Sequence, residues 1–173
     1  MKRITTPLDS KQIKSLKAGD ELLLSGVIYT ARDQAHKRLI EALAKHKKMP
    51  LELAGAVIYY CGPTQTPKGK VIGACGPTTS SRMDEFTPGL LAKGLKGMIG
   101  KGSRSQALKA AIKKYQGVYF VTYAGCAALL NQFVKSAKTI AYPDLGPEAI
   151  LKLEVENFPL IVAIDFQGED IYG

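Results

Sequence analysis

The stretch Leu22-Leu-Leu-Ser-Gly-Val-Ile-Tyr29 and the residues that follow it decide the fold class of this chain. Its continuous apolar character is typical of a buried strand. From Asp33 the spacing of apolar residues changes to that of a helix, which must end before Pro50. The apolar face of this helix consists of Ala35, Leu39, Ala42, Leu43 and His46. A buried strand followed directly by an amphipathic helix indicates an α/β unit.

Outward from this unit, strands and helices alternate through the middle of the chain. We expect strands at 56–61, 70–75, 97–100 and 118–122, and helices that begin with Thr87-Pro88, at Ser105 and at Cys126, the last of them ending at Val134. The tail is expected to hold strands at 139–142 and 160–165, with a helical turn after Pro147. Extra strands between residues 20 and 75 and in the tail favour a mixed sheet. The sequence therefore predicts a single α/β domain with a mixed sheet over residues 1–173.

Length and composition limit the class of protein. The chain has 173 residues, 46% of them hydrophobic, which suits one domain with its own core. No apolar run approaches the ~20 residues that a membrane span needs, and the first residues lack the apolar segment of a secretory signal. Three cysteines, an odd number, argue against a disulfide framework. We therefore expect a cytoplasmic protein that does not bind a membrane.

The net charge of +9 is spread unevenly. The first 115 residues carry 21 basic and 8 acidic groups, whereas the rest carry 3 and 7. A basic N-terminal part is typical of proteins that bind nucleic acid, an anionic substrate or a partner subunit. A lysine-rich solvated surface gives the same charge pattern. Nucleic acid is the weaker alternative, because few aromatic residues lie among the basic ones and no nucleic-acid-binding motif is present.

Three cations follow expected strands. Arg32 comes after the first strand, Arg82 follows the strand expected at 70–75, and Lys101 follows 97–100. Ligands of α/β sheets bind outside the carboxyl ends of strands, and arginine can hold a carboxylate through two parallel hydrogen bonds. The three cations therefore predict a site for a small anion with more than one negative charge. The alternative is surface ion pairing, of Arg82 with Asp84 or of Arg32 with Asp33.

A hydroxyl-rich loop, Gly76-Pro-Thr-Thr-Ser-Ser81, precedes Arg82. A hydroxyl is a poor base unless a neighbouring group assists it, so from the residues alone Thr78 is either a base or a turn residue. The glycine-rich segment 94–103 lacks the residues of a phosphate-binding loop at Leu95 and Gly102. Nucleoside triphosphate hydrolysis is therefore not expected.

The cysteines and histidines give weaker signals. Cys61, Cys75 and Cys126 lack the spacing of a metal or cluster motif, and the first two end buried strands, where free cysteine is a common core residue. His36 and His46 do not share a helix face closely enough for a metal pair. We expect no metal ligand in this chain, and His36 near Arg32 is a supporting residue at most.

Four longer motifs stand out in the chain. They are Ser25-Gly-Val-Ile-Tyr-Thr-Ala-Arg-Asp-Gln-Ala-His-Lys-Arg38, Gly76-Pro-Thr-Thr-Ser-Ser-Arg-Met-Asp84, Gly94-Leu-Lys-Gly-Met-Ile-Gly-Lys-Gly102, and the tail from Gly146-Pro-Glu-Ala-Ile150 to Phe158-Pro-Leu-Ile-Val-Ala-Ile-Asp165. Together they resemble the β subunit of the class I, iron–sulfur-dependent fumarate hydratase and L(+)-tartrate dehydratase family, which is the C-terminal domain in single-chain members. The resemblance extends over nearly the whole chain.

The resemblance implies a specific activity. Members add water reversibly across the double bond of a dicarboxylate, giving malate from fumarate or oxaloacetate from tartrate. It implies a swivelling β/β/α-type domain that closes over the substrate, with Arg32, Arg82 and Lys101 on the carboxylates and Thr78 as the catalytic base. Thr79, His36 and Asp84 are expected to support these residues.

The resemblance also implies a partner. The [4Fe-4S] cluster is held by an α subunit, so this chain is expected to bind no cofactor alone and to act as half of a catalyst, in an α2β2 assembly. The sequence does not separate fumarate from tartrate or methylated analogues. A non-enzymatic module that binds an anion or nucleic acid remains the alternative from a different class.

Overall fold

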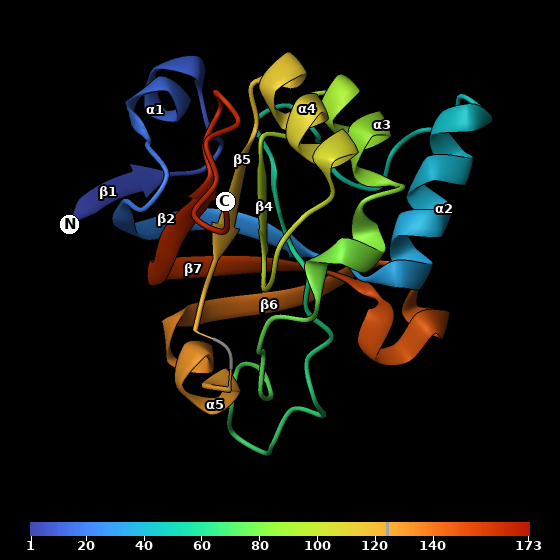
Figure 1. Cartoon of the computed structure of the whole chain (residues 1–173). Helices are drawn as coiled ribbons and strands as arrows, with labels where there is room; N and C mark the ends of the chain where they lie inside the picture. Colours follow the sequence, from blue (N-terminus) through green and yellow to red (C-terminus); the bar gives the residue numbers. More distant parts are fainter. Residues whose placement is uncertain (124) are drawn as a thin grey trace.

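The computed structural model describes residues 1–123 and 125–173, and these form a mixed sheet with helices around it (Figure 1). The strand order is β1-β2-β3-β4-β5-β7-β6. The strands are β1 (Lys2–Thr5), β2 (Glu21–Thr30), β3 (Val57–Tyr59), β4 (Gly97–Gly100), β5 (Val118–Val121), β6 (Val134–Ala141) and β7 (Ile150–Ile164). The α-helices are α1 (Ser10–Ser15), α2 (Asp33–Ala44), α3 (Thr87–Ala92), α4 (Gln106–Tyr115) and α5 (Ala127–Leu130), and short 3₁₀ turns are η1 (Ser80–Met83), η2 (Asn131–Phe133) and η3 (Pro143–Glu148).

The sheet closes on itself through its last strand. Strands β2, β3, β4 and β5 are parallel neighbours, and β7 pairs antiparallel with β5 on one side and β2 on the other. These five strands form a closed ring of backbone pairing, to which β1 and β6 are added at β2 and β7. Because four ring strands are parallel, the residues that follow β2, β3, β4 and β5 leave the ring at one edge.

Strand β2 pairs with β1 along its first half and with β3 at its end, and it bends at Gly26 between the two. The register shifts between Leu24 and Gly26, and Gly26 has a φ of +112°, which favours glycine. A Cβ atom there would lie 2.3 Å from the hydroxyl oxygen of Thr6. The bend lets the first half of β2 pair with β1 while its last residues pair with β3.

Alternating side chains of the strands divide the core into two clusters. Tyr59, Ile99 and Phe120 belong to the first, together with Phe158 of β7 and Ile13 of α1. The neighbouring residues Ile58, Met98 and Tyr119 belong to the second, against the buried faces of α2, α3 and α4. This is the alternation expected when both faces of parallel strands are buried, and Figure 1 shows α2, α3 and α4 on one side of the sheet.

The structure confirms the mixed α/β class and most elements of the central region. Ser105 caps α4, because its hydroxyl oxygen accepts a hydrogen bond from the backbone N–H of Leu108 at 3.1 Å. The cap expected at Thr87 is wrong: Phe86 is the N-cap of α3, and the Thr87 hydroxyl donates to the backbone oxygen of Met83 at 2.7 Å.

Other expectations are corrected. Residues 70–75 form no strand, because Ala74 bonds back across its own loop to Thr64. The helix expected to Val134 ends at Leu130, and Val134 already begins β6. The helical turn expected after Pro147 lies before and around it, in η3. Strand β7 is longer than expected, and β1 and α1 were not predicted.

No helix within residues 1–123 and 125–173 is long and apolar enough to cross a membrane.

Candidate active site

The sheet brings three of the predicted site residues to one edge. Arg32 follows β2 and is the N-cap of α2, and Lys101 follows β4. The backbone N–H of Thr78 donates to the carbonyl oxygen of Tyr60, the residue after β3, at 2.8 Å. Since β2, β3 and β4 are adjacent and parallel, these residues gather at the carboxyl ends of three neighbouring strands, where ligands of such sheets bind.

Arg82 joins this group through its side chain. Its Nη2 donates to the hydroxyl oxygen of Thr78 at 2.9 Å, while Nε and Nη2 donate to the two carboxylate oxygens of Asp33 at 3.0 and 3.3 Å. Asp33 is the first residue of α2, where a negative charge is favoured by the helix dipole. Arg82 therefore connects Thr78 to the Asp33 carboxylate, and Asp33 is the residue next to Arg32 in the chain.

The charge of Asp33 is stabilised by this arrangement. Partial burial alone would raise the pKa of the Asp33 carboxyl. Hydrogen bonds from Arg82 and the backbone, together with the charges of Arg82 and Arg32, outweigh burial and lower that pKa below its ordinary value. Neither ion pair considered from the sequence forms, since Arg82 pairs with Asp33 and not with Asp84, and Arg32 has no ion pair with Asp33 among the described side chains.

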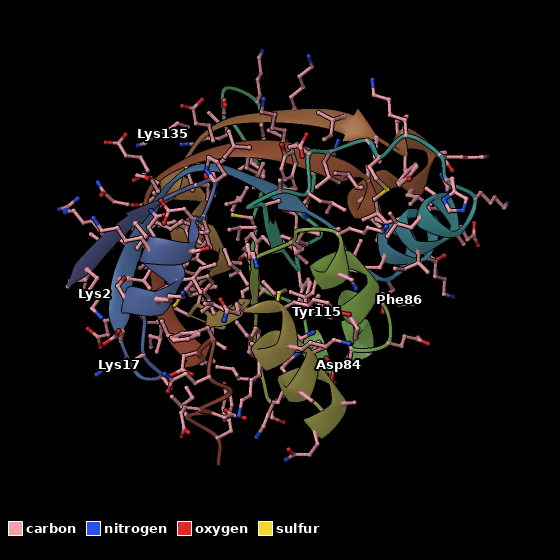
Figure 2. All side chains as sticks on the ribbon, turned by 90° about the horizontal axis from the view of Figure 1, so that it is seen from above. Lys2, Lys17, Asp84, Phe86, Tyr115 and Lys135 are labelled. Carbon is pink, nitrogen blue, oxygen red and sulfur yellow. The ribbon has the colours of Figure 1, made fainter. Side chains whose placement is uncertain are left out.

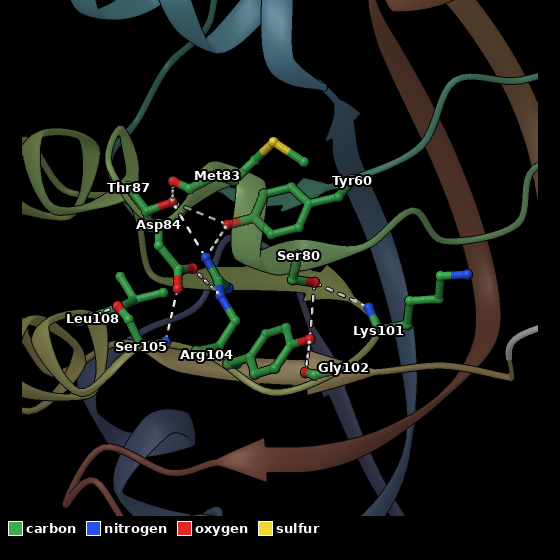
Figure 3. Close-up of polar contacts among 11 residues, drawn as sticks. Tyr60, Ser80, Met83, Asp84, Thr87, Lys101, Gly102, Arg104, Ser105 and Leu108 are labelled. Atoms are coloured by element: carbon green, nitrogen blue, oxygen red, sulfur yellow. Dashed lines mark hydrogen bonds and ion pairs between the residues drawn. The ribbon is translucent and has the colours of Figure 1, made fainter.

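Asp84 instead pairs with Arg104, a residue that sequence reasoning missed (Figure 3). The Arg104 side chain is fully buried, and its Nε lies 2.5 Å from a carboxylate oxygen of Asp84. Its guanidinium stacks on the rings of Tyr60 and Tyr119, with its central carbon 5.1 and 4.7 Å from the two ring centroids. Asp84 also accepts from the backbone N–H of Ser105, which fixes the start of α4.

Arg104, Asp84, Tyr60 and Tyr119 form a cluster, here called the Arg104 cluster, and its Tyr119 also contacts the loop that carries Thr78. The Ser80 hydroxyl oxygen accepts from the Tyr119 hydroxyl at 2.8 Å and from the backbone N–H of Lys101 at 3.0 Å. The Ser80 N–H in turn donates to the carbonyl oxygen of Lys101 at 3.1 Å. Figure 3 shows the Lys101 side chain directed away from the Arg104 cluster. The hydroxyl loop and the residue after β4 are thus held together by the Ser80 hydroxyl and by one backbone hydrogen bond.

Gly100 is required for this close approach. A Cβ atom at this position would lie 1.9 Å from the Ser80 hydroxyl oxygen and 2.9 Å from a ring carbon of Tyr60. The segment of η1 therefore packs on β4 where the strand has no side chain.

Arg32 lies over a second glycine. A Cβ at Gly62 would be 3.0 Å from both Cδ and Nη1 of Arg32. The Nε of Arg32 is buried and has no hydrogen-bond partner within the described structure. Gly62 thus leaves the space in which the Arg32 side chain lies.

His36 supports the backbone of Arg32. Its Nδ1 lies 2.8 Å from the carbonyl oxygen of Arg32, and its ring packs edge-on against Tyr60 with centroids 5.4 Å apart. Burial lowers the pKa of His36 to about 4, although the hydrogen bond to Arg32 opposes this. His36 is therefore neutral near pH 7, and it contacts the site through the backbone of Arg32. Thr79 is exposed and forms a single parallel bridge with Lys101.

The cysteines do not fit an iron–sulfur cluster held by this chain. Cys61 and Cys75 are buried and Cys126 is exposed. Burial raises the pKa of the Cys61 thiol far above its usual range and that of Cys75 to about 11, which disfavours the thiolate that a metal needs. Within residues 1–123 and 125–173, no group of three or more His, Cys, Asp or Glu side chains could hold a metal ion.

Figure 2 places Asp84 and Phe86 on the side of α3 and α4, across the molecule from Lys2 and Lys17. The ion pair that anchors the hydroxyl loop is thus far from the basic residues near the N-terminus. Those residues belong to a different surface, where Lys2 pairs with Asp20.

Comparison with known proteins identifies the family of the chain. Residues 2–173 match the model of the family described as "Fumarase C-terminus". The chain therefore belongs to the Fumarase C-terminus family, and the resemblance seen in its sequence is confirmed.

Relatives of two lengths match the chain. It is 41% identical over 171 residues to the "Putative L(+)-tartrate dehydratase subunit beta" of Methanocaldococcus jannaschii, covering 95% of this chain and 88% of that protein. It is 40% identical over 163 residues to the aerobic class I fumarate hydratase of Escherichia coli K12, covering 93% of this chain but 30% of that protein. Fumarate hydratase 2 of Leishmania major is 35% identical over 171 residues, covering 96% of this chain and 30% of the relative. The chain thus spans about 30% of the length of these two fumarate hydratases.

Proposed function

We propose that this chain is the β subunit of a hydro-lyase that reversibly adds water to a dicarboxylate, converting fumarate to malate. The observation that carries the proposal is the link between Arg82 and Thr78 at a sheet edge that also bears Arg32 and Lys101. Family membership supports the same reaction class.

Charge at this edge matches a dicarboxylate. Arg32, Arg82 and Lys101 supply three positive charges, of which Asp33 offsets one. The remaining charge suits a dianion, and guanidinium groups hold a carboxylate in a fixed orientation. In this proposal the cations place the carbon chain beside the Thr78 hydroxyl, which lowers the entropic cost of reaching the reactive geometry.

Thr78 is the proposed base. In the dehydration direction Thr78 acts as an alkoxide, its own proton having passed to solvent. It takes a proton from the carbon adjacent to the one that bears the hydroxyl, the C–H electron pair forms the double bond, and the hydroxyl leaves with the electrons of its C–O bond. The alkoxide needs stabilisation, and the positively charged guanidinium of Arg82, which donates a hydrogen bond to the Thr78 oxygen, supplies it.

The proposal includes a partner subunit. An iron–sulfur cluster on an α subunit would supply a Lewis acid for the departing hydroxyl. Support comes from the tartrate dehydratase relative, whose name marks it as one subunit, and from the poor fit of this chain's own cysteines to a cluster. An α2β2 assembly, a swivelling movement that closes the site and a cytoplasmic location belong to the same proposal.

Reconstitution tests the proposed function. The purified chain should be colourless and inactive, and hydration of fumarate should appear when an α subunit that carries the cluster is added. An isolated chain that absorbed broadly near ~400 nm and hydrated fumarate by itself would contradict this division of labour.

L(+)-tartrate is the second candidate substrate, because the relative matched over 88% of its length carries that name. The carboxylate-binding residues suit both substrates. Comparing kcat/KM of the reconstituted complex for fumarate, malate and L(+)-tartrate distinguishes the two candidates.

A further inference from the structure

Asp33 pairs with Arg82, the residue that donates to Thr78, but takes no part in the proposed reaction. It belongs to the rigid first turn of α2, and its side chain is 27% exposed. Arg82 is on a short 3₁₀ turn, with a side chain 46% exposed. An exposed arginine loses rotamer entropy when it is held in one conformation. The contact therefore holds the long, exposed Arg82 side chain against Asp33, which is fixed in the first turn of α2.

The contact uses one edge of the guanidinium group. Asp33 accepts from Nε and Nη2 of Arg82 at 3.0 and 3.3 Å, and Nη2 also donates to Thr78 at 2.9 Å. Within the described residues, these are the hydrogen bonds that the Arg82 guanidinium makes to other side chains. Because the guanidinium is planar, fixing the Nε edge also fixes the direction of Nη1. Nη1, bonded to the same guanidinium carbon as the Nη2 that contacts Thr78, is then the group left for a ligand.

We propose that Asp33 is a positioning residue of the active site, which orients Arg82 so that one guanidinium group contacts Thr78 and a substrate carboxylate together. This inference rests on the proposed hydro-lyase function. Asp33 does not itself touch the substrate in this arrangement. Its negative charge lowers the local attraction for a dianion, so its contribution is to orientation and not to binding strength.

This trade-off predicts a split between the two kinetic constants. In Asp33→Asn the side chain can still accept one hydrogen bond, but it loses the second acceptor and the charge. We expect kcat of the reconstituted complex to fall roughly 10- to 100-fold, the range produced by small misplacement of a reacting group. The KM should stay the same or fall, because the site becomes more positive.

The chain offers a matched control on the same helix. Arg38 of α2 donates from Nη1 and Nη2 to the two carboxylate oxygens of Asp144, at 2.8 and 2.5 Å. Asp144→Asn therefore removes a bidentate arginine partner of α2 away from the site and should leave kcat and KM unchanged. Asp33→Glu keeps the charge and both acceptors, and it should recover part of the lost kcat.

A direct measurement on the full chain is independent of activity. The Nε–H proton signal of Arg82, assigned by its loss in Arg82→Lys, should exchange slowly with water in the wild type and faster in Asp33→Asn. A rise in KM without a fall in kcat, an unchanged kcat in an active complex, or equal exchange rates would each overturn the role of Asp33. An inactive wild-type complex would overturn the proposed function and this role with it, and is distinguished by the wild-type assay alone.

Discussion

Arg104 and Asp84 form an ion pair within the protein, with Nε of the arginine 2.5 Å from a carboxylate oxygen and no part of the arginine side chain exposed. The arginine lies between the rings of Tyr60 and Tyr119, which follow or belong to two strands of the ring. The aspartate connects it to the start of α4. Tyr60 follows β3, Arg104 follows β4 and Asp84 follows η1, so these contacts join three segments next to the candidate site.

Asp84→Asn should destabilise the fold strongly, because it leaves the Arg104 charge buried without a counter-charge. Removal of one partner of a buried pair costs about 3–5 kcal/mol. Urea unfolding followed by circular dichroism measures the change. Asp144→Asn, which breaks an exposed pair, is the control and should change the free energy of unfolding little. Equal effects of the two variants would contradict the importance of burial.

His36 should make the fold less stable in mild acid. Its pKa is lowered to about 4 in the folded chain, mainly by burial, against about 6.5 in an unfolded chain. Between these values the unfolded state binds the extra proton, so stability falls as the pH drops from about 6.5 to about 4, by about 3 kcal/mol in total.

His36→Gln should flatten this dependence, as measured by unfolding free energies at several pH values in that window. The carboxyl of Asp33, whose pKa is lowered, adds a loss of stability only at lower pH. The exposed His46 provides the control, since His46→Gln should preserve the slope. A slope that survives in His36→Gln would show that other groups cause it.

Gly100→Ala should destabilise the chain by about 1–3 kcal/mol, as overpacking of a tight contact does. The added methyl group would meet the Ser80 hydroxyl oxygen and the Tyr60 ring. Ser80→Gly removes one of these clashes, so the double variant should lose less stability than the two single changes added together. Strict additivity in urea unfolding would show that the two residues do not meet.

Thr78→Ala should lower kcat of the reconstituted complex by roughly 10²- to 10⁴-fold, the range for loss of a general base. The KM should change less, because the three cations remain. Thr78→Ser retains the hydroxyl that accepts from Arg82 and should recover most of the rate. A Thr78→Ala complex with normal turnover would remove this residue as the base.

One thiol should react rapidly in the native chain. Cys126 is exposed, whereas Cys61 and Cys75 are buried, and burial raises the pKa of both buried thiols. Titration with a chromogenic disulfide should therefore show one fast equivalent in buffer and three in denaturant. Cys126→Ser should abolish the fast phase, and its survival would place the reactive thiol elsewhere.

Local sequence signals predicted the elements whose pattern is self-contained. The helical period from Asp33 and the Ser105 cap belong to this group. The segment 70–75 misled because it is apolar and sits between turns, yet its backbone bonds pair it with its own loop. The apolar pattern does not show whether such a segment pairs with a distant strand or with its own loop, because that depends on which partner the fold brings beside it.

The candidate site shows the same limit. The strand-end rule applies to Arg32, Arg82 and Lys101 in the sequence: Arg32 and Lys101 do follow the strands β2 and β4, whereas no strand forms at 70–75 before Arg82. The partners of the charged residues could not be predicted, because Asp33 and Arg82 are 49 residues apart and meet only through the sheet. A buried Arg104 was unexpected, since arginine is mostly exposed, and its partner Asp84 is 20 residues away in the chain. The pattern Arg104-Ser105 before a helix gave no clue to that burial.

The pairing of β7 has a consequence for biosynthesis. This strand, residues 150–164, completes the ring by joining β2 and β5, which are synthesised much earlier. Until residues 150–164 have been synthesised, the facing edges of β2 and β5 lack this partner and the ring stays open. Unpaired strand edges favour pairing between chains, so the ring is exposed to that hazard during synthesis until β7 joins it.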